Sequence, residues 1–386
     1  MQLPQGFRAH TANVGIKDGT TDFTVVAADR PCAASAVFTK SRFAGPSVTL
    51  SRANAADGRL QAIVVVSKNA NVATGPEGDA DALELVEGVA RALGCAPADV
   101  LVASTGVIGR RYPMDRVRTH LASLPAPDGT DATAVAEAIM TTDTHPKTAR
   151  GTVPTAGGGE ASVVGIAKGV GMIEPDMATM LAFVLTDAEV PAADLDQAFR
   201  AVVERTFNSL SVDTDTSTSD TAAVLASGAA GPVDVTALEA ALEQVCLDLT
   251  RQLAADGEGA ETLIVVTVDG ARDRDQAKRV AKAIVNSPLV KTAVHGADPN
   301  WGRIAMAIGK CSDDTDIDQR AVTIRIGDQE LYPAPADDDA LARLTEYLRG
   351  DEVLIHVSLG IGDGAATVYG CDLTDGYVRI NADYTT

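Results

Sequence analysis

The sequence predicts a mixed α/β fold in which strands and helices do not alternate strictly. Short runs of aliphatic and β-branched residues predict six strands, and apolar residues spaced three or four apart predict helices between some of them. A doubly wound parallel sheet would need regular strand–helix alternation, which the order of these segments does not provide. The chain has 386 residues, enough for two or three core-sized units.

The predicted strands are apolar runs bounded by polar or turn-forming residues. In chain order they cover 60–67, 99–105, 179–186, 262–268, 320–326 and 352–359. The glycine-rich segment 152–162, TVPTAGGGEAS, predicts a loop upstream of the third strand.

Two helices are predicted from apolar residues that recur on one face. In the segment 81–94 these residues are Leu83, Val86, Ala90 and Leu93. After Pro191 they are Leu195, Phe199 and Val202.

A third, longer helix is predicted after Pro232. Thr236 and Glu239 have the spacing of a capping box, in which two side chains satisfy free backbone N–H groups at a helix start. An apolar stripe follows at Leu238, Leu242, Val245, Leu249 and Leu253. The glycines of DGEG, 256–259, should end this helix.

Composition and charge exclude several classes of protein. The formal net charge of −21 argues against a nucleic-acid partner, so any anionic substrate must be bound by a few local cations. No apolar run is long enough to span a membrane, and the first ten residues lack a signal-peptide layout. The five cysteines are scattered and form no CxxC pair, which predicts reduced thiols in a cytoplasmic protein.

Common catalytic motifs are missing or incomplete. No GxSxG serine motif occurs, and the segment 304–311 fails as a phosphate-binding loop because Ile304 replaces its first glycine. The glycine-rich segment 360–365 precedes a strand-like run where a dinucleotide site needs a helix. The five histidines lie far apart; His295 and Asp298 could bind a metal, but a polar loop is the favoured interpretation.

The segment 168–183, KGVGMIEPDMATMLAF, places Thr179 at the start of a predicted buried strand. A threonine hydroxyl needs a neighbouring base to act as a nucleophile, and a chain's own α-amino group, with a pKa of about 8, can serve. That role requires cleavage before Thr179, for which the small Ala178 and the bend-permitting Gly169, Gly171 and Pro175 are suited. On spacing alone, however, a threonine that simply begins a strand is the favoured interpretation.

The same segment strongly resembles the self-cleavage segment of the ornithine acetyltransferase family, written K-G-x-G-M-x-x-P-x-M-A-T-M-L. Further family signatures follow in order over nearly the whole chain. They are SKNANVATG (67–75), ASTGVIGRRYPMDRV (103–117), MTTDTHPK (140–147), VDTDTSTSDT (212–221), DGEGA (256–260), VNSPLVKTAVHGADPNWGR (285–303) and NADYTT (381–386). This ordered set of matches favours the nucleophile interpretation of Thr179.

The resemblance implies an α-β-β-α sandwich of the N-terminal-nucleophile type. It also implies self-cleavage between Ala178 and Thr179, started by an N→O acyl shift and completed by water. The products would be an α chain of residues 1–178 and a β chain of residues 179–386, which would stay associated. Two copies of each would form an α2β2 heterotetramer.

The activity implied is ping-pong acetyl transfer without a cofactor or metal. Thr179 would take the acetyl group of N-acetylornithine, release ornithine, and pass the acetyl group to glutamate. Thr105 and Gly106 match the family's oxyanion-stabilising pair. The remaining substrate contacts would be Lys168, which would pair with the α-carboxylate, together with Thr142, Glu258, Asn381 and Thr386. Thr141 is a rival to Thr142, because one residue of register separates them.

Some positions depart from the family pattern and leave alternatives open. Lys68 and Thr214 stand where glycine is more familiar, Ser219 stands where asparagine is, and Asp176 stands where asparagine or serine is common. The acyl donor and acceptor, the use of acetyl-CoA and a role in a specialised pathway therefore stay open. A self-cleaving amide hydrolase or aminopeptidase is the rival enzyme, and an uncleaved binding protein is the rival without chemistry.

Overall fold

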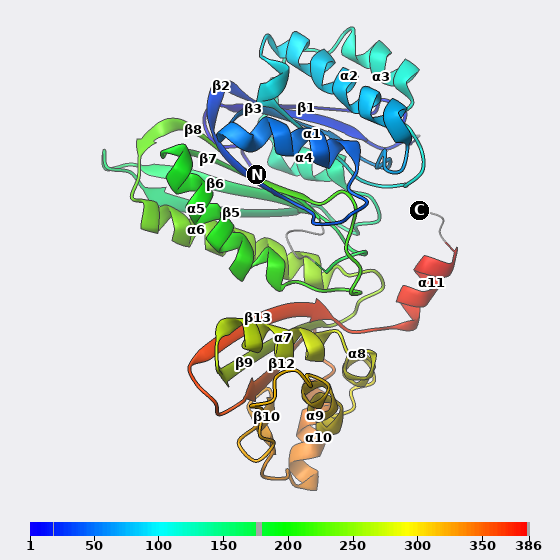
Figure 1. The fold of residues 1–386 in the computed structure, drawn as a ribbon, viewed down its shortest axis with the longest axis vertical. Coiled ribbons are helices and arrows are strands. Elements are labelled where there is room, and N and C mark those ends of the chain that lie inside the picture. The colour runs from blue at the N-terminus through cyan, green and yellow to red at the C-terminus, as the bar shows by residue number, and fades with distance from the viewer. Residues whose placement is uncertain (18, 175–179, 384–386) are drawn as a thin grey trace.

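The computed structural model describes residues 1–17, 19–174 and 180–383. These residues form a larger body built on an eight-stranded sheet and a smaller body built on a five-stranded sheet. The larger body occupies the upper part of Figure 1, and the smaller body lies beneath it. Within the described ranges, no helix has the length and hydrophobicity required to cross a bilayer.

The elements have the following bounds. The strands are β1 (Phe7–Ala12), β2 (Phe23–Phe38), β3 (Arg59–Val66), β4 (Val100–Ser104), β5 (Lys147–Pro154), β6 (Glu160–Lys168), β7 (Leu181–Glu189), β8 (Thr221–Pro232), β9 (Leu263–Ala271), β10 (Thr323–Ile326), β11 (Gln329–Tyr332), β12 (Glu352–Ser358) and β13 (Gly364–Cys371). The helices are α1 (Pro46–Asn54), α2 (Gly75–Leu93), α3 (Met114–Leu121), α4 (Ala132–Ile139), α5 (Ala192–Arg205), α6 (Val235–Ala255), α7 (Arg274–Val285), α8 (Pro288–His295), α9 (Trp301–Gly309), α10 (Asp338–Tyr347) and α11 (Asp375–Asp383).

The larger sheet has the strand order β4-β3-β2-β8-β7-β6-β5, with β1 paired to β2. The long strand β2 links its two halves, because it pairs with β1 and β3 along its first part and with β8 along Ala33–Phe38. The register with β3 shifts between Ala27 and Cys32, and such an irregularity lets a strand bend. The sheet therefore folds into two stacked layers.

Three hydrophobic clusters establish the order of the layers. The outer face of the β2-β3-β4 half packs on α2 and α3, through residues such as Val64 and Leu85. Its inner face packs on α4 and on the inner face of β6-β7-β8, through residues such as Ile63 and Phe183. The outer face of that second half packs on α5 and α6. The predicted α-β-β-α sandwich is therefore confirmed.

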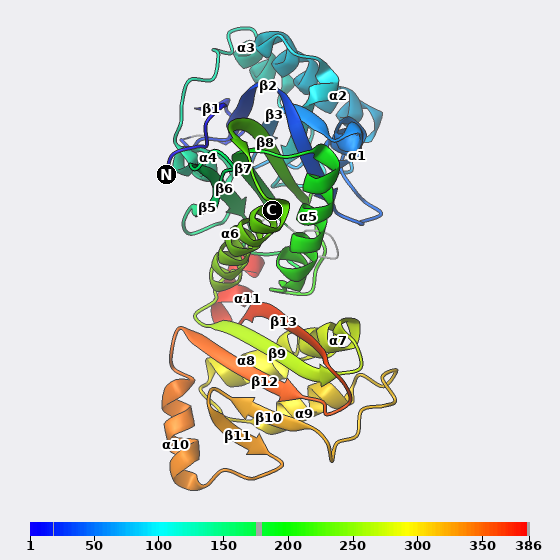
Figure 2. The ribbon, with the colours of Figure 1, turned by 90° about the vertical axis from the view of Figure 1, so that its left-hand side faces the viewer.

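The smaller body is a five-stranded sheet in the order β11-β10-β12-β9-β13, and α7 packs on one face of β9 and β13. The other face of β9 and β13 docks on α6, so the two bodies share one apolar cluster. Figure 2 shows these two strands next to the larger body. Their contributions to the cluster are Leu263, Val265, Tyr369 and Cys371.

Each of the six predicted strands contains an observed strand, although β10 begins at Thr323 and not at 320. The predicted stripes of α5 and α6 are buried. The predicted loop 152–162 is shorter than expected, because β5 extends to Pro154 and β6 begins at Glu160. Two further details were wrong. Leu83 is 44% exposed, because α2 buries the face that carries Ala82, Leu85 and Val89 instead. The capping box does not form: the N-cap of α6 is Asp234, which accepts from the Ala237 N–H, while Glu239 pairs with Arg205.

Candidate functional site

A cavity of about 170 Å³ lies where the ends of β4 and β6 meet the loops that follow them. This is below the several hundred Å³ typical of drug-sized ligands, so a small metabolite is the appropriate size of occupant. Its walls come from eight short segments of the chain. They are Lys68, Ala70, Thr105–Ile108, Thr141–Thr142, Lys168, Gly169, Gly171, Met172, Met180, Leu181, Ser217–Asp220, Glu258 and Asn381.

Thr105 and Gly106 form the turn that follows β4. The Thr105 N–H donates to the Val66 carbonyl, and the Gly106 N–H has no acceptor among the described residues. The Thr105 hydroxyl and the Gly106 N–H are therefore the donors that this pair can offer. Gly106 has φ +126°, and a Cβ there would lie 2.3 Å from the carbonyl carbon of Lys68. Only glycine fits this position, because both the backbone conformation and the close contact exclude a side chain.

Lys168, the last residue of β6, is only 8% exposed and donates from Nζ to the Thr105 hydroxyl oxygen at 3.2 Å. An ammonium can only donate, so this contact leaves the hydrogen of the Thr105 hydroxyl available to another acceptor. Burial lowers the pKa of Lys168, and the nearby Asp143 carboxylate opposes that shift. The cation and the hydroxyl therefore form one donor group on the cavity wall.

Glu258 also lines the cavity, and both of its carboxylate oxygens are hydrogen-bonded. The Thr142 hydroxyl donates to Oε1 at 3.0 Å, and the Asn381 side-chain amide donates to Oε2 at 2.9 Å. The Glu258 N–H donates to the Val170 carbonyl, which fixes the loop after α6 against the turn after β6. The carboxylate is thus held in one orientation, where it can accept from a ligand amine.

Thr141 and Thr142 both line the cavity, so both predicted alternatives contact the same space. Their groups are used differently: the Thr142 hydroxyl binds Glu258, whereas the Thr141 N–H donates to Asp143 at 3.0 Å. The geometry therefore favours Thr142 as the side chain that shapes the site.

A fully buried ion network lies behind the cavity wall. Lys147 is 0% exposed and donates from Nζ to Asp143 at 2.8 Å and to Asp256 at 2.5 Å. Asp143 also accepts from the Gly169 N–H, and Asp256 accepts from the Thr144 N–H. Burial alone would raise the pKa of Asp143, but Lys168 and Lys147 outweigh it and lower the pKa to about 2.

This network ties together the three segments that carry Thr142, Lys168 and Glu258. Sequence reasoning missed it, although Asp143 and Lys147 both lie within the segment MTTDTHPK. An Asp and a Lys four residues apart are usually a surface pair, so the sequence signal was ambiguous.

Six of the predicted site residues thus line one cavity: Thr105, Gly106, Thr142, Lys168, Glu258 and Asn381. Ala178, Thr179 and Thr386 lie outside the described residues. Met180 and Leu181, where the described chain resumes, are part of the cavity wall.

The histidine considered as a metal ligand does not pair with Asp298. His295 Nδ1 lies 3.2 Å from Asp372 and 3.6 Å from Glu261, while Asp298 contacts Asn300 and Arg303. Asp372 is also held by the N–H groups of Glu261 and Thr262. A hydrogen bond from His295 to Asp372 that anchors the loop after β13 accounts for this arrangement.

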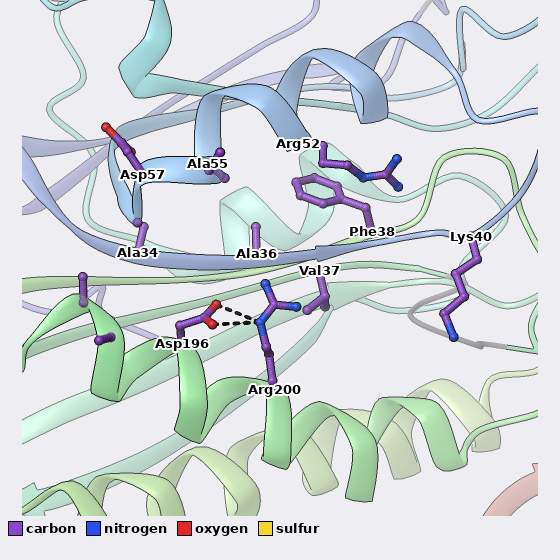
Figure 3. Close-up of a pocket in the computed structure, with 14 residues that line it drawn as sticks. Ala34, Ala36, Val37, Phe38, Lys40, Arg52, Ala55, Asp57, Asp196 and Arg200 are labelled. Atoms are coloured by element: carbon purple, nitrogen blue, oxygen red, sulfur yellow. Dashed lines mark hydrogen bonds and ion pairs between the residues drawn. The ribbon is translucent and has the colours of Figure 1, made fainter.

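A larger groove of about 700 Å³ lies between α1 and α5 across β2 (Figure 3). Two of its charged groups pair with each other: Arg200 binds Asp196, which also accepts from the Ser35 hydroxyl. Arg52 lies over the Phe38 ring. None of the six predicted site residues that the structure describes lines this groove. Size alone therefore does not identify the reaction site.

The layering places the chain among proteins with the fold of N-terminal-nucleophile enzymes. The model of the ArgJ family matches residues 8–386. The chain belongs to the ArgJ family. This membership confirms the predicted family and fold class, and it confirms the predicted enzyme class, an acyltransferase that transfers acetyl groups.

Similar proteins cover the whole chain. Glutamate N-acetyltransferase Oat2 of Streptomyces clavuligerus is 60% identical over 392 residues, which include 100% of this chain and 98% of that protein. Arginine biosynthesis bifunctional protein ArgJ of Rhodococcoides fascians is 54% identical, over 99% of this chain and 94% of its own length. The crystal structure of arginine biosynthesis bifunctional protein ArgJ from Bacillus halodurans is 44% identical with a TM-score of 0.50, and the match covers 53% of this chain and 100% of that chain.

Proposed function

We propose that this chain is a glutamate N-acetyltransferase that cleaves itself between Ala178 and Thr179 and moves an acetyl group from N-acetylornithine to glutamate. One observation carries the proposal. Lys168 with the adjacent Thr105 hydroxyl, the turn at Gly106 and the oriented Glu258 carboxylate line one small cavity. The wall of this cavity includes Met180, the residue after the proposed nucleophile.

In the first half-reaction the Thr179 hydroxyl attacks the acetyl carbonyl of N-acetylornithine, and its proton passes to the Thr179 α-amino group. The oxyanion that forms accepts from the Thr105 hydroxyl and the Gly106 N–H, each worth about 3 kcal/mol in such sites. The amide C–N bond then breaks. The α-nitrogen of the ornithine moiety takes up the proton from the Thr179 α-ammonium group, and ornithine leaves. An acetyl-threonine ester remains.

In the second half-reaction the neutral α-amine of glutamate attacks that ester. The same two donors stabilise the second oxyanion, and the Thr179 oxygen leaves and recovers a proton. Lys168 pairs with the substrate α-carboxylate in both halves, because it is a buried cation beside the oxyanion donors. Glu258 pairs with the side-chain ammonium of the ornithine moiety.

The cut at Ala178–Thr179 would divide the larger sheet between the two products. Strands β7 and β8 would belong to the β chain, residues 179–386, yet they lie between β2 and β6 of the α chain, residues 1–178. Each product would expose unpaired strand edges and apolar faces if they separated. This interleaving supports a permanently associated α and β pair, and we propose that two such pairs form the α2β2 heterotetramer.

The family match favours transfer over hydrolysis, because the similar Oat2 protein is named for glutamate N-acetylation. The cation Lys168 and the carboxylate Glu258 in one cavity are suited to an amino-acid substrate. The five cysteines are free thiols, which is consistent with our assignment of the enzyme to the cytoplasm.

The test begins with the intact mass of the purified protein and of Thr179→Ala under denaturing conditions. We expect the wild type to give two chains that separate after Ala178, and the variant to give one uncut chain. The wild type should then form N-acetylglutamate from N-acetylornithine and glutamate. An uncut wild-type chain would refute the nucleophile, and acetate release without N-acetylglutamate would make the enzyme a hydrolase.

A further inference from the structure

Lys68 occupies an unusual backbone conformation at the cavity wall. It follows β3 in the segment SKNAN and has φ +69°, in the left-handed region that favours glycine. A non-glycine residue in this region costs of order 1 kcal/mol and tends to persist where the side chain is needed for function. The strained backbone of Lys68 therefore suggests that its side chain has a function in the cavity.

The position of Lys68 is fixed relative to the proposed oxyanion donors. A Cβ placed on Gly106 would lie 2.6 Å from the Lys68 Cα, so the two backbones are in direct contact. The Val107 N–H also donates to the Lys68 carbonyl at 3.4 Å. The side chain of Lys68 thus starts directly beside the site of chemistry.

The Lys68 ammonium is partly used by the protein. Its Nζ donates to the Ser67 hydroxyl oxygen at 2.9 Å and to the Thr21 carbonyl. An ammonium has three N–H donors, and contacts among the described residues account for two of them. One donor with a positive charge therefore remains for a ligand.

The charges on the cavity wall differ in what they can bind. Among its described residues the cations are Lys68 and Lys168, and the carboxylates are Glu258 and Asp220. The proposed function assigns Lys168 to the α-carboxylate and Glu258 to the side-chain ammonium of ornithine. The side-chain carboxylate of glutamate would be repelled by Glu258, so it needs a different partner.

We propose that Lys68 is a specificity-determining residue whose ammonium binds the side-chain carboxylate of the acceptor. This inference rests on the proposed function and adds to it the group that selects a dicarboxylic amino acid. The donor and acceptor share the contact with Lys168, and their oppositely charged side chains turn to Glu258 and Lys68 respectively. Selection is then made by direct charge pairing on each side of the cavity.

The protonation of Lys68 gives this pairing a pH dependence. Burial lowers the pKa of Lys68 to about 8. The charged groups that act on it are Asp22 and Asp143, which raise the pKa, and Lys17 and Lys168, which lower it. The ammonium is present below about pH 8 and is lost above it, so preference for a carboxylate acceptor should weaken as pH rises through 8.

The experiment compares glutamate with glutamine, a neutral acceptor of the same shape, after acetylation of the enzyme by N-acetylornithine. It uses the wild type, Lys68→Met, Lys68→Gly and the control Lys17→Met, which removes a nearby charge that does not line the cavity. Ornithine release in a single turnover reports the first half-reaction separately. Self-cleavage and circular dichroism report folding, and Lys68→Gly removes the side chain without backbone strain.

We expect both Lys68 variants to raise KM for glutamate by about tenfold or more, the effect of one lost charge-assisted hydrogen bond, with ornithine release little changed. The glutamate-to-glutamine preference should fall in both variants, and in the wild type it should fall between about pH 7 and pH 9. The ratio cancels the titration of the Thr179 amine, which both acceptors use. An unchanged preference in folded Lys68 variants would overturn the inference while the proposed function stood. Failure of the wild type to transfer acetyl groups would instead remove the proposed function and this inference with it.

Discussion

Replacing Lys147 by methionine tests the buried network behind the cavity. The side chains of Asp143 and Asp256 are 0% and 4% exposed, and Lys147 is the cation that both contact. Methionine keeps most of the volume of the lysine stem but leaves two buried carboxylates without it. Removing one partner of a buried ion pair costs about 3–5 kcal/mol, because the remaining charge stays desolvated. We expect Lys147→Met to lose that much free energy of unfolding at pH 7.

The assay is urea unfolding of Lys147→Met beside a matched control, Arg205→Met. Arg205 also pairs with two carboxylates, Glu239 and Glu243, but all three side chains are 34–39% exposed. Exposed pairs contribute about 0–1 kcal/mol, so the control should barely change stability. Equal losses of unfolding free energy in the two variants would refute the argument that burial increases the contribution of the Lys147 network to stability.

The difference in free energy of unfolding between the wild type and Lys147→Met should depend on pH, because Asp143 titrates. Its pKa is lowered in the folded state to about 2. A carboxyl group with a lowered pKa stabilises the fold at pH values above its unfolded pKa of about 3.9, and this stabilisation is lost as pH falls toward 2. In Lys147→Met, Asp143 loses one of the cations that lower its pKa, so it takes up a proton at a higher pH than in the wild type. The advantage of the wild type should therefore be full at neutral pH and shrink over the window from the variant's higher pKa down to about pH 2. A difference that grows in this window would contradict the ionised state of Asp143.

Two further substitutions test the catalytic geometry. Gly106→Ala should lower kcat by about 10²–10³-fold, because a methyl group would meet the Lys68 backbone at 2.3 Å and displace the donor N–H. Acetyl-transfer assays on folded protein check this prediction. Undiminished turnover would exclude Gly106 as an oxyanion donor. Glu258→Gln should raise KM for N-acetylornithine about tenfold and KM for glutamate less, because only N-acetylornithine carries a side-chain ammonium that can pair with Glu258. Steady-state kinetics with each substrate varied in turn check this prediction. Equal effects on the two KM values would argue against that pairing.

Local patterns predicted those parts of the fold where one apolar face decides the structure. The α6 stripe is continuous, and all five of its predicted residues are buried. Strand β2 was missed, because two charged residues and a proline, Asp29, Arg30 and Pro31, interrupt its apolar run where the strand bends. The interruption is the feature that lets one strand serve both layers. A bend of this kind depends on the partners β3 and β8, and local sequence does not contain that information.

For the candidate site, the identities of the residues were predicted but their contacts with one another were not. Thr105, Lys168 and Glu258 came from the family resemblance, since isolated threonine, lysine and glutamate residues carry no distinctive local signal. The sequence did not reveal that Lys168 donates to Thr105 or that Thr142 donates to Glu258. These contacts join segments 63 and 116 residues apart, so they depend on how the sheet layers stack.

The distribution of charge explains how an acidic protein can bind acidic substrates. A net charge of −21 repels an anion at long range, but salt screens exposed charges beyond about 8 Å under physiological conditions. Lys168 and Lys147 are buried, where screening is weak and effective dielectric constants are lower than in water. Lys147 is neutralised by Asp143 and Asp256, and its role is to hold the walls of the cavity. Lys168 and Lys68 line the cavity, and in the proposed function they act on the substrate over a few ångströms. Under that proposal, local geometry and not net charge determines what binds.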